Sequence, residues 1–428
     1  MNRFRTMPRL RFLAILIFGS GLYFLANLQR VAIPGAVFDR LQQLYGSQAA
    51  GIAGLGAAFM YAYALMQPMT GLLLDRFGSG RVLIGGGLLF ASGEMLFARS
   101  GSLATACCAQ ILTGLGAGSL YLALVRENLR LFHDRSNLTL AVIILIGYSG
   151  GIAANAPLLM MVRRFGLTES LTTAAGLAFL IWFCCTLLIL RGTLPKERKN
   201  RTFSPKEFLP VFQLPHNNRL YCFSAVNFAL FYVLQTVIGK KFLQDFCGVS
   251  DLRAGWLFSA TGAVAALSGL VMAAASQLLG NRRRIFCRIA GISSVSVFSL
   301  IFLLICGNVR NGTLFALLFL LLSATASLST IVIPLLHETN PEHLTGRAVC
   351  MLNFSFYLSV AVFGNLAGGL LKMFQPQFRN GTAVYGQTAW GTLFGAFLPA
   401  AGTVCYFSFQ MRETFGRKIL IPSKGKNI

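Results

Sequence analysis

Charged residues are scarce in this chain, and acidic residues are the scarcest. Of its 428 residues only 13 are Asp or Glu, and charged residues of both signs make up 12%. Hydrophobic residues make up 55%, and the mean hydropathy is +0.66. These values lie outside the range of soluble globular chains. We therefore expect lipid to surround most of this protein.

The chain also lacks the motifs of enzymes. Its ten cysteines show no C-x-x-C spacing, and the sequence contains no zinc-ligand helix pattern, no phosphate-binding loop and no nucleophile paired with a base. The cysteines are scattered through apolar blocks, as small buried thiols are. We therefore expect no enzymatic activity, no catalytic residue, no cofactor and no bound metal.

Long apolar runs are abundant. A membrane-spanning helix needs about 20 mostly apolar residues, and the sequence offers twelve such blocks. They cover residues 12–35, 48–70, 82–99, 103–124, 138–162, 170–190, 220–243, 254–279, 285–307, 313–336, 348–374 and 389–411. A polar stretch divides the blocks six and six. The sequence thus predicts a six-helix bundle at 1–190, a cytoplasmic linker at 191–219, a second six-helix bundle at 220–411 and a cytoplasmic tail at 412–428.

The excess of basic residues predicts the orientation of the chain. There are 37 Lys and Arg residues, and the formal net charge is +24. If both termini are cytoplasmic, the inner segments carry 26 of these residues and the outer segments carry 10, as expected when basic loops are retained inside. Anionic lipid headgroups then account for the basic charge, and nucleic acid is not needed as a partner. We expect a monomeric multi-pass protein of a bacterial inner membrane.

A short charged turn lies between the second and third apolar blocks. It reads Gly71-Leu-Leu-Leu-Asp75-Arg76-Phe-Gly78-Ser-Gly-Arg81. This string resembles, position by position, the signature between helices two and three of the major facilitator superfamily of secondary transporters. The resemblance implies an all-α integral membrane fold with twelve transmembrane helices in two pseudo-symmetric six-helix bundles. It also implies a gating role for Gly71, Asp75, Arg76, Gly78 and Arg81.

Three positions depart from the pattern of that family. Gln110 stands in the fourth block where the family usually has an arginine that is often tied to proton coupling. The proline-glycine signature that resembles drug antiporters is not well formed in the fifth block. A degenerate second copy of the turn follows the eighth block at residues 277–284, with Gln277 in place of the aspartate. The first two departures disfavour multidrug export.

Arg30 is the most informative residue for the substrate. A charged residue deep in a membrane helix costs about 2.5 to 3.5 kcal/mol on insertion scales, so we expect it to face protein or a water-filled cavity. Tyr23, Asn27 and Arg30 are spaced i, i+4 and i+7, which places them on one face of a helix. A fixed cation in a transporter cavity favours an anionic substrate. The alternative is that Arg30 lies near the outer membrane face and snorkels to headgroups.

The strings at residues 27–34 and 61–68 resemble the organic-anion and organophosphate branches of the superfamily. In those branches an arginine at the place of Arg30 contacts a carboxylate or phosphate. The seventh block offers no matching arginine, so a single cation favours a monocarboxylate. Further candidates for substrate contacts are Gln110, Tyr148, Asn155, Asn227, Gln235, Asn353 and Tyr357. The alternative for these residues is hydrogen bonding between helices in a polar seam.

The mode of energy coupling stays open at this point. Proton symport normally needs an embedded carboxylate or histidine, and the candidates are Glu94, His337 and Glu338. Proton coupling, facilitated diffusion and exchange against a counter-anion are all compatible with these residues.

The predicted function is secondary active or facilitative transport of a small carboxylate-type organic anion by alternating access. Two alternatives stay open. One is export of amphipathic compounds, for which 37 Phe and 12 Met residues offer an adaptable apolar lining. The other is a sensor or scaffold that keeps the fold and no longer transports.

Overall fold

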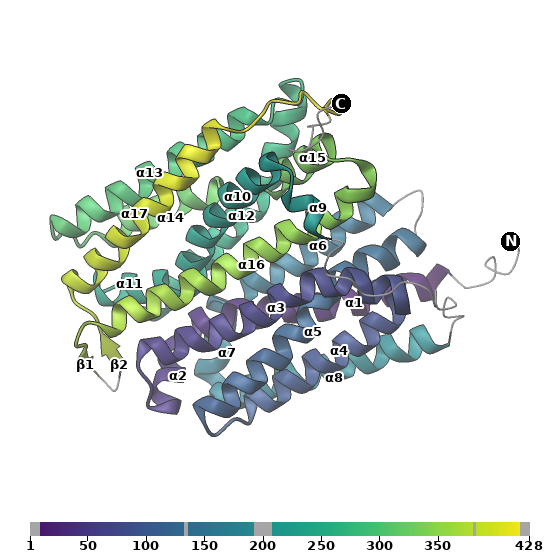
Figure 1. Cartoon of the computed structure of the whole chain (residues 1–428). Coiled ribbons are helices and arrows are strands. Elements are labelled where there is room, and N and C mark those ends of the chain that lie inside the picture. Colours follow the sequence, from purple (N-terminus) through teal and green to yellow (C-terminus); the bar gives the residue numbers. More distant parts are fainter. Residues whose placement is uncertain (1–8, 132–135, 192–207, 380–381, 420–428) are drawn as a thin grey trace, which may run out of the picture. The chain divides into compact units, whose positions relative to one another are not determined.

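The chain folds almost entirely into helices (Figure 1). The computed structural model describes residues 9–131, 136–191, 208–379 and 382–419. Eleven of the described helices are long and apolar enough to cross a membrane, and one bent pair makes a twelfth span. The predicted all-α membrane fold is therefore confirmed. The predicted linker lies mostly outside the described residues, as does the end of the predicted tail.

The first part of the chain supplies the helices that carry Arg30 and the charged turn. From the N-terminus the elements are α1 (Arg9–Val31), the π-helix η1 (Ala32–Ala36), α2 (Phe38–Tyr45), α3 (Ala49–Phe77), α4 (Ser79–Ala98), α5 (Leu103–Leu131), α6 (Ser136–Ala153), α7 (Ala156–Phe165) and α8 (Leu167–Leu190).

The second part contains the remaining helices and one small hairpin. Its elements are α9 (Leu209–Phe212), α10 (Pro215–Val233), the π-helix η4 (Leu234–Ile238), α11 (Gly239–Asp245), α12 (Asp251–Leu278), α13 (Arg284–Cys306), α14 (Gly312–Ala324), α15 (Ser329–Thr339), α16 (Glu342–Lys372), β1 (Gln377–Arg379), β2 (Thr382–Val384) and α17 (Gln387–Phe409).

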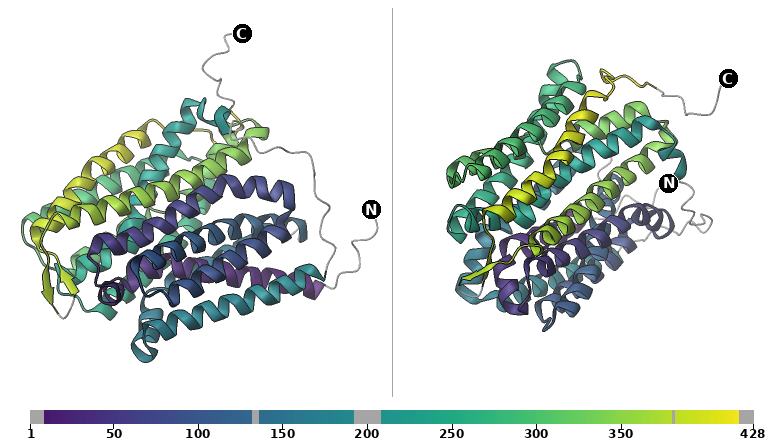
Figure 2. Two further views of the ribbon diagram at one scale, coloured as in Figure 1. Left: turned by 60° about the horizontal axis from the view of Figure 1, so that its bottom comes forward. Right: turned by 60° about the vertical axis from the view of Figure 1, so that its left-hand side comes forward.

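The helices group into two compact units, and within each unit they run alongside one another (Figure 2). The first unit contains Met1–Ile33 and Ala58–Phe203, and the second contains Pro34–Ala57 and Ser204–Ile428. The division falls within η1 and within α3. Residues 34–57, which include the end of the first predicted span, the predicted loop after it and the start of the second span, therefore pack with the C-terminal part of the chain.

Small residues let the helices of the first unit approach closely. Here α4 packs along α5 and α8, and α1 packs against α6 and α8. A Cβ atom on Gly116 of α5 would lie 2.3 Å from the backbone nitrogen of Phe90 and 2.6 Å from the carbonyl oxygen of Gly86, both on α4. Only glycine fits at this contact, as is common where membrane helices pack without a hydrophobic driving force.

The predicted span at 138–162 is not one straight helix. The axes of α6 and α7 differ by 51° across the break between them. Asn155 has a non-helical ψ of −108°, and Pro157 occupies the first turn of α7. Since proline has no amide proton and clashes with the preceding turn, the break follows from the sequence.

An aromatic core organises the second unit. In this unit α13 packs along α17, and α10 packs against both α16 and α17. The fully buried Phe242 of α11 meets Phe315, Trp390 and Phe394 edge to face, with ring centroids 4.9, 5.3 and 5.1 Å apart. Such pairs add about 0.5 to 1.5 kcal/mol each beyond burial. This core fixes α11, which carries two buried lysines.

Candidate functional site

Arg30 is a buried cation inside the first unit. It lies in the last turn of α1, and only 7% of its surface is exposed. Its guanidinium carbon lies 5.7 Å from the centroid of the Tyr63 ring on α3, and its Nη2 donates a hydrogen bond to the Oδ1 atom of Asn27. A guanidinium can stack on an aromatic face and still present donors to a second partner. The contacts show that Arg30 faces protein.

The three residues predicted to share one face of the first helix are linked in the structure. The Asn27 side chain donates from Nδ2 to the carbonyl oxygen of Tyr23, 2.8 Å away, and accepts from Arg30. The Tyr23 ring stacks on Tyr121 of α5 at a centroid distance of 5.3 Å, and it also fills the space beside Gly147 of α6. Asn27 is thereby oriented so that its oxygen faces the arginine.

The other polar candidates of the first unit lie in different surroundings. Gln110 of α5 is 1% exposed, and its Nε2 has no hydrogen-bond partner among the described residues. Asn155 is buried at the α6–α7 break, where its Nδ2 donates to the carbonyl oxygen of Gly151 at 3.1 Å. Tyr148 is exposed. Asn155 therefore has a local structural role at the break, and its substrate contact stays a prediction.

The candidates of the second unit lie on α10, η4 and α16. Asn227 is buried, and Gln235, Asn353 and Tyr357 are partly buried. Phe228, next to Asn227, contacts the Tyr357 ring edge to face at a centroid distance of 5.9 Å. The α10 and α16 candidates are thus connected through an aromatic contact.

The charged turn is held by residues from α5. Gly78 has a φ of +79°, a conformation that favours glycine. Asp75 accepts a hydrogen bond from Arg126 at 2.8 Å. Ser79 donates to the fully buried Glu127, which also accepts from Arg130. The ends of α3, α4 and α5 are therefore tied together by charge at one end of the unit.

The remaining residues of the turn are less constrained. Arg76 is exposed and lies 5.2 Å from the centroid of the Phe77 ring, while Gly71 and Arg81 are partly buried. The gating role of these residues stays a prediction.

The degenerate second turn is also held by acids. Arg283 donates from Nη2 and Nε to the two carboxylate oxygens of Glu338, at 2.7 and 3.3 Å. The Glu413 carboxylate accepts from the backbone amides of Arg283 and Arg284, at 2.7 and 3.0 Å, and so satisfies the first amides of α13. Glu338, one of the predicted coupling residues, is thus half of a bidentate ion pair.

The other two coupling candidates differ sharply in burial. Glu94 of α4 is 4% exposed, and its Oε1 has no hydrogen-bond partner in the described part of the chain. His337 is exposed at the end of α15. No group of three or more His, Cys, Asp or Glu side chains among the described residues is placed to hold a metal ion.

Sequence reasoning missed a buried charged cluster in the second unit. Lys240 and Lys241 were counted with the outer segments, yet they are only 5% and 3% exposed. Lys241 pairs with both Asp39 and Asp245, at 3.1 and 3.0 Å. The available signal for this cluster was the occurrence of two lysines and an acid together at the end of one apolar block. Asp39 of α2, the partner of Lys241, is distant in sequence and could not be identified from it.

Comparisons with known proteins bear on the whole chain. Residues 19–364 match the model of the Major Facilitator Superfamily. No curated protein sequence matches. Among solved structures, a variant of the nucleoside transporter NupG is similar with a TM-score of 0.73 and 15% identity, over 94% of this chain and 99% of that chain. The peptide transporter POT, also a variant, is similar with a TM-score of 0.70 and 14% identity, over 96% of both chains.

Proposed function

The chain belongs to the Major Facilitator Superfamily, and we propose that it carries a small organic anion of the carboxylate type across the membrane. It is a multi-pass membrane transporter and not an enzyme. The substrate class is our proposal, and so is alternating access between two six-helix bundles at 1–190 and 220–411. The solved structures are similar in fold at low identity, so their substrates are not transferred to this chain.

The observation that carries the proposal is the burial of Arg30. A charged side chain within a membrane span normally faces the protein interior or a cavity and marks a transport pathway. Arg30 is anchored on one side by Tyr63 and on another by the Asn27 oxygen. The fork of a guanidinium matches the two oxygens of a carboxylate, and it keeps its charge at every physiological pH. One such cation suits a singly charged substrate.

The rest of the proposed pathway follows from the sequence. We propose that both termini lie in the cytoplasm of a bacterial cell, so that residues 36–47 and the β1–β2 hairpin are extracytoplasmic. A proton or a counter-anion is the proposed coupling partner, and the transporter is proposed to act as a monomer. The further contact residues proposed are Tyr23, Gln110, Tyr148, Asn155, Asn227, Gln235, Asn353 and Tyr357.

The first test is thermal stabilisation of the purified protein by a panel of compounds. A ligand that binds the folded state raises the apparent melting temperature by mass action. The panel contains carboxylates, sugar acids, organophosphates, amino acids, neutral sugars, nucleosides and lipophilic cations. Stabilisation confined to anions supports the proposal. Stabilisation confined to lipophilic cations contradicts it and favours the export of amphipathic compounds.

The second test is flux into proteoliposomes with Arg30→Gln and a matched control. Arg164→Gln is the control, because Arg164 also lies over a ring, 5.3 Å from the Phe165 centroid, but is exposed. Arg30→Gln should abolish anion uptake while Arg164→Gln leaves it near wild type. Equal uptake by both variants contradicts the role of Arg30. Absence of flux for every compound that binds would favour a sensor or scaffold.

A further inference from the structure

A group of five buried or partly buried charges, which we call the α2–α11 cluster, lies in the second unit. Its members are Asp39, Lys240, Lys241, Asp245 and Asp251. Lys240 pairs with Asp251 at 2.6 Å. Lys241 lies between Asp39 and Asp245, at 3.1 and 3.0 Å. The side chains of the two lysines are 6% and 4% exposed, and that of Asp245 is 2% exposed. Charges at this depth need partners, since desolvation is costly.

The cluster contains one carboxylate more than it contains ammonium groups. Lys240 and Asp251 balance each other, whereas Lys241 is shared by two acids. Asp245 is held further by the backbone amide of Tyr385, which donates to its Oδ2 at 2.9 Å. Of the two acids that share Lys241, Asp39 is the more accessible, with a side chain 22% exposed. Addition of one proton would make the cluster neutral, and water reaches Asp39 more easily than Asp245.

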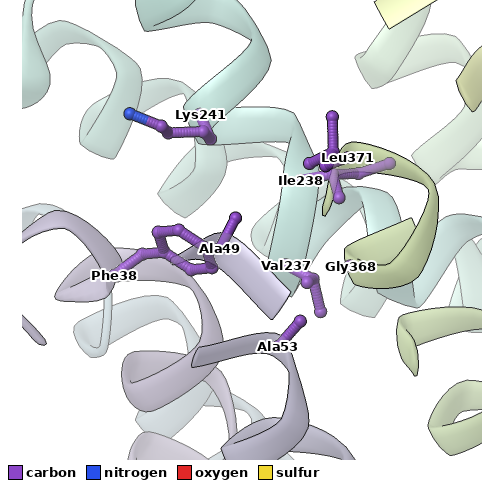
Figure 3. A pocket seen from close by; sticks show the side chains of 8 residues that line it. All are labelled: Phe38, Ala49, Ala53, Val237, Ile238, Lys241, Gly368 and Leu371. Carbon is purple, nitrogen blue, oxygen red and sulfur yellow. The ribbon is translucent and has the colours of Figure 1, made fainter. Parts of the chain in front are cut away.

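The ion pair between Asp39 and Lys241 joins two parts of the chain that are distant in sequence. Asp39 lies on α2, whereas Lys241 and Asp245 lie on α11. Lys241 also lines a small cavity across which Phe38, Ala49 and Ala53 face Val237, Ile238 and Leu371, and its side chain extends away from these apolar groups (Figure 3). The ion pair thus closes a seam of otherwise apolar contacts.

Close contacts at two glycines show how tightly this seam is closed. A Cβ on Gly35 of η1 would lie 2.4 Å from the carbonyl oxygen of Thr236 in η4. A Cβ on Gly368 of α16 would lie 2.7 Å from the Cβ of Ala53 on α3. Lys240 also donates to the carbonyl oxygen of Ala36. Residues 34–57 are therefore held against α11 and α16 by close packing, and charged side chains add further contacts.

Other charged or titratable groups around the seam do not replace these partners. Arg40 on α2, Arg253 on α12 and Lys372 on α16 are exposed. Arg310 lies over the Phe246 ring, 5.7 Å from its centroid. Burial raises the pKa of Tyr385, so its hydroxyl stays neutral beside the cluster.

We propose that the α2–α11 cluster is a proton-binding latch, in which protonation of Asp39 releases α2 from Lys241 and lets residues 34–57 separate from α11 and α16. A proton from water binds a carboxylate oxygen of Asp39 and removes its charge. Lys241 then keeps a single acidic partner, Asp245, on its own helix. The ion pair across the seam is lost, while no buried ammonium is left without a carboxylate.

With this latch, the proton becomes the coupling ion of the proposed transporter. This role rests on the proposed transport function. In the proposed orientation, α2 and the hairpin face the outside of the cell. Low external pH would then open the extracytoplasmic side of the pathway. This assignment moves coupling from Glu94, His337 and Glu338 to a site where one ammonium is shared between two elements.

The test is a distance measurement across the seam without substrate. Spin labels are attached through non-canonical amino acids at Leu44 of α2 and Phe378 of β1, both exposed, so that the ten native cysteines are unchanged. Distance distributions are recorded in lipid nanodiscs from about pH 8 to about pH 4, a range that extends to the usual pKa of an aspartate side chain. Because no substrate is present, the result does not depend on which anion is carried.

Three variants sharpen the measurement. Asp39→Asn should raise the ratio of long to short distances at least tenfold at high pH and remove its pH dependence. Asp245→Asn leaves Lys241 and Asp39 as a one-to-one pair, so the short distance should persist to lower pH than in wild type. Arg40→Gln, the neighbouring charge outside the cluster, should titrate like wild type.

The pattern of results separates the latch from a static ion pair. A wild-type distance that lengthens on acidification, with the Asp39→Asn response lost, supports the latch. A wild-type distance distribution that does not change with pH overturns the proposal, as does an Asp39→Asn variant that titrates like wild type. Loss of flux with an intact pH response would instead count against the proposed transport function.

Discussion

The contact between the two π-helices η1 and η4 makes a sharp steric prediction. The perturbation is Gly35→Ala, which adds a single methyl group at a close backbone contact. The new Cβ would lie 2.4 Å from the oxygen, 3.1 Å from the carbon and 3.3 Å from the Cα of Thr236. All three are backbone atoms, so no side chain can rotate away. The seam must widen or the fold must adjust.

The expected magnitude follows from the size of this overlap. Overpacking a close contact costs about 1 to 3 kcal/mol, and this cost falls on the state in which η1 touches η4. If residues 34–57 separate from α11 during transport, the separated state becomes more populated. Since 1.4 kcal/mol is a factor of ten, the ratio of separated to closed molecules should rise about 5- to 150-fold.

The assay is the distance between labels at Leu44 and Phe378, at a fixed pH. Gly54→Ala on α3 is the matched control, because a Cβ there meets no atom within 4 Å. Gly35→Ala should shift the distribution to longer distances, and Gly54→Ala should not. Identical distributions for the two variants would refute the inference that this contact closes the seam.

Three further predictions test the rest of the structure. Gly116→Ala should lower the free energy of unfolding by about 1 to 3 kcal/mol through backbone overlap, measured by thermal unfolding in detergent. Gly176→Ala, whose added Cβ meets no neighbour, should not lower it. Equal stability of the two variants would contradict the α4–α5 packing. The ion pair of Asp75 with Arg126 is partly exposed, so a double-mutant cycle on stability should give a coupling of about 0.2 to 1 kcal/mol; a value several times larger would mean that the pair is less solvated than the structure has it. Tyr63→Leu should weaken anion binding about 2- to 30-fold by removing a cation–π contact of about 0.5 to 2 kcal/mol, and Tyr63→Phe should weaken it less; equal losses would exclude the ring as the cause.

The membrane spans could be predicted because length and hydropathy are local properties. The apolar blocks recur in the structure as helices, and Tyr23, Asn27 and Arg30 share a face because α1 is regular over those residues. The break in the fifth span was missed although Pro157 was visible. A bend within an apolar run does not show in the hydropathy of the sequence, since hydropathy does not depend on the direction of the helix axis.

Pairings between helices could not be predicted. Tyr63 and Arg126 contact Arg30 and Asp75 across helices, and no periodicity within one helix reveals such a partner. The buried lysines are the clearest case. Charges at the end of an apolar block are normally solvated and help to set orientation, whereas Lys241 is buried and pairs with Asp39 of α2, which is distant in sequence.

The central claim is that Arg30 recognises the charge of the substrate, and one measurement tests it most directly. The dissociation constant of the best-binding carboxylate is compared with that of its uncharged amide, for wild type, Arg30→Lys, Arg30→Gln and Arg164→Gln. Loss of a charge-assisted hydrogen-bonded pair of about 3 kcal/mol corresponds to about 100-fold in affinity. The account predicts a preference of that order for the carboxylate in wild type and Arg164→Gln, a smaller preference in Arg30→Lys, and none in Arg30→Gln. An undiminished preference for the carboxylate in Arg30→Gln would contradict it.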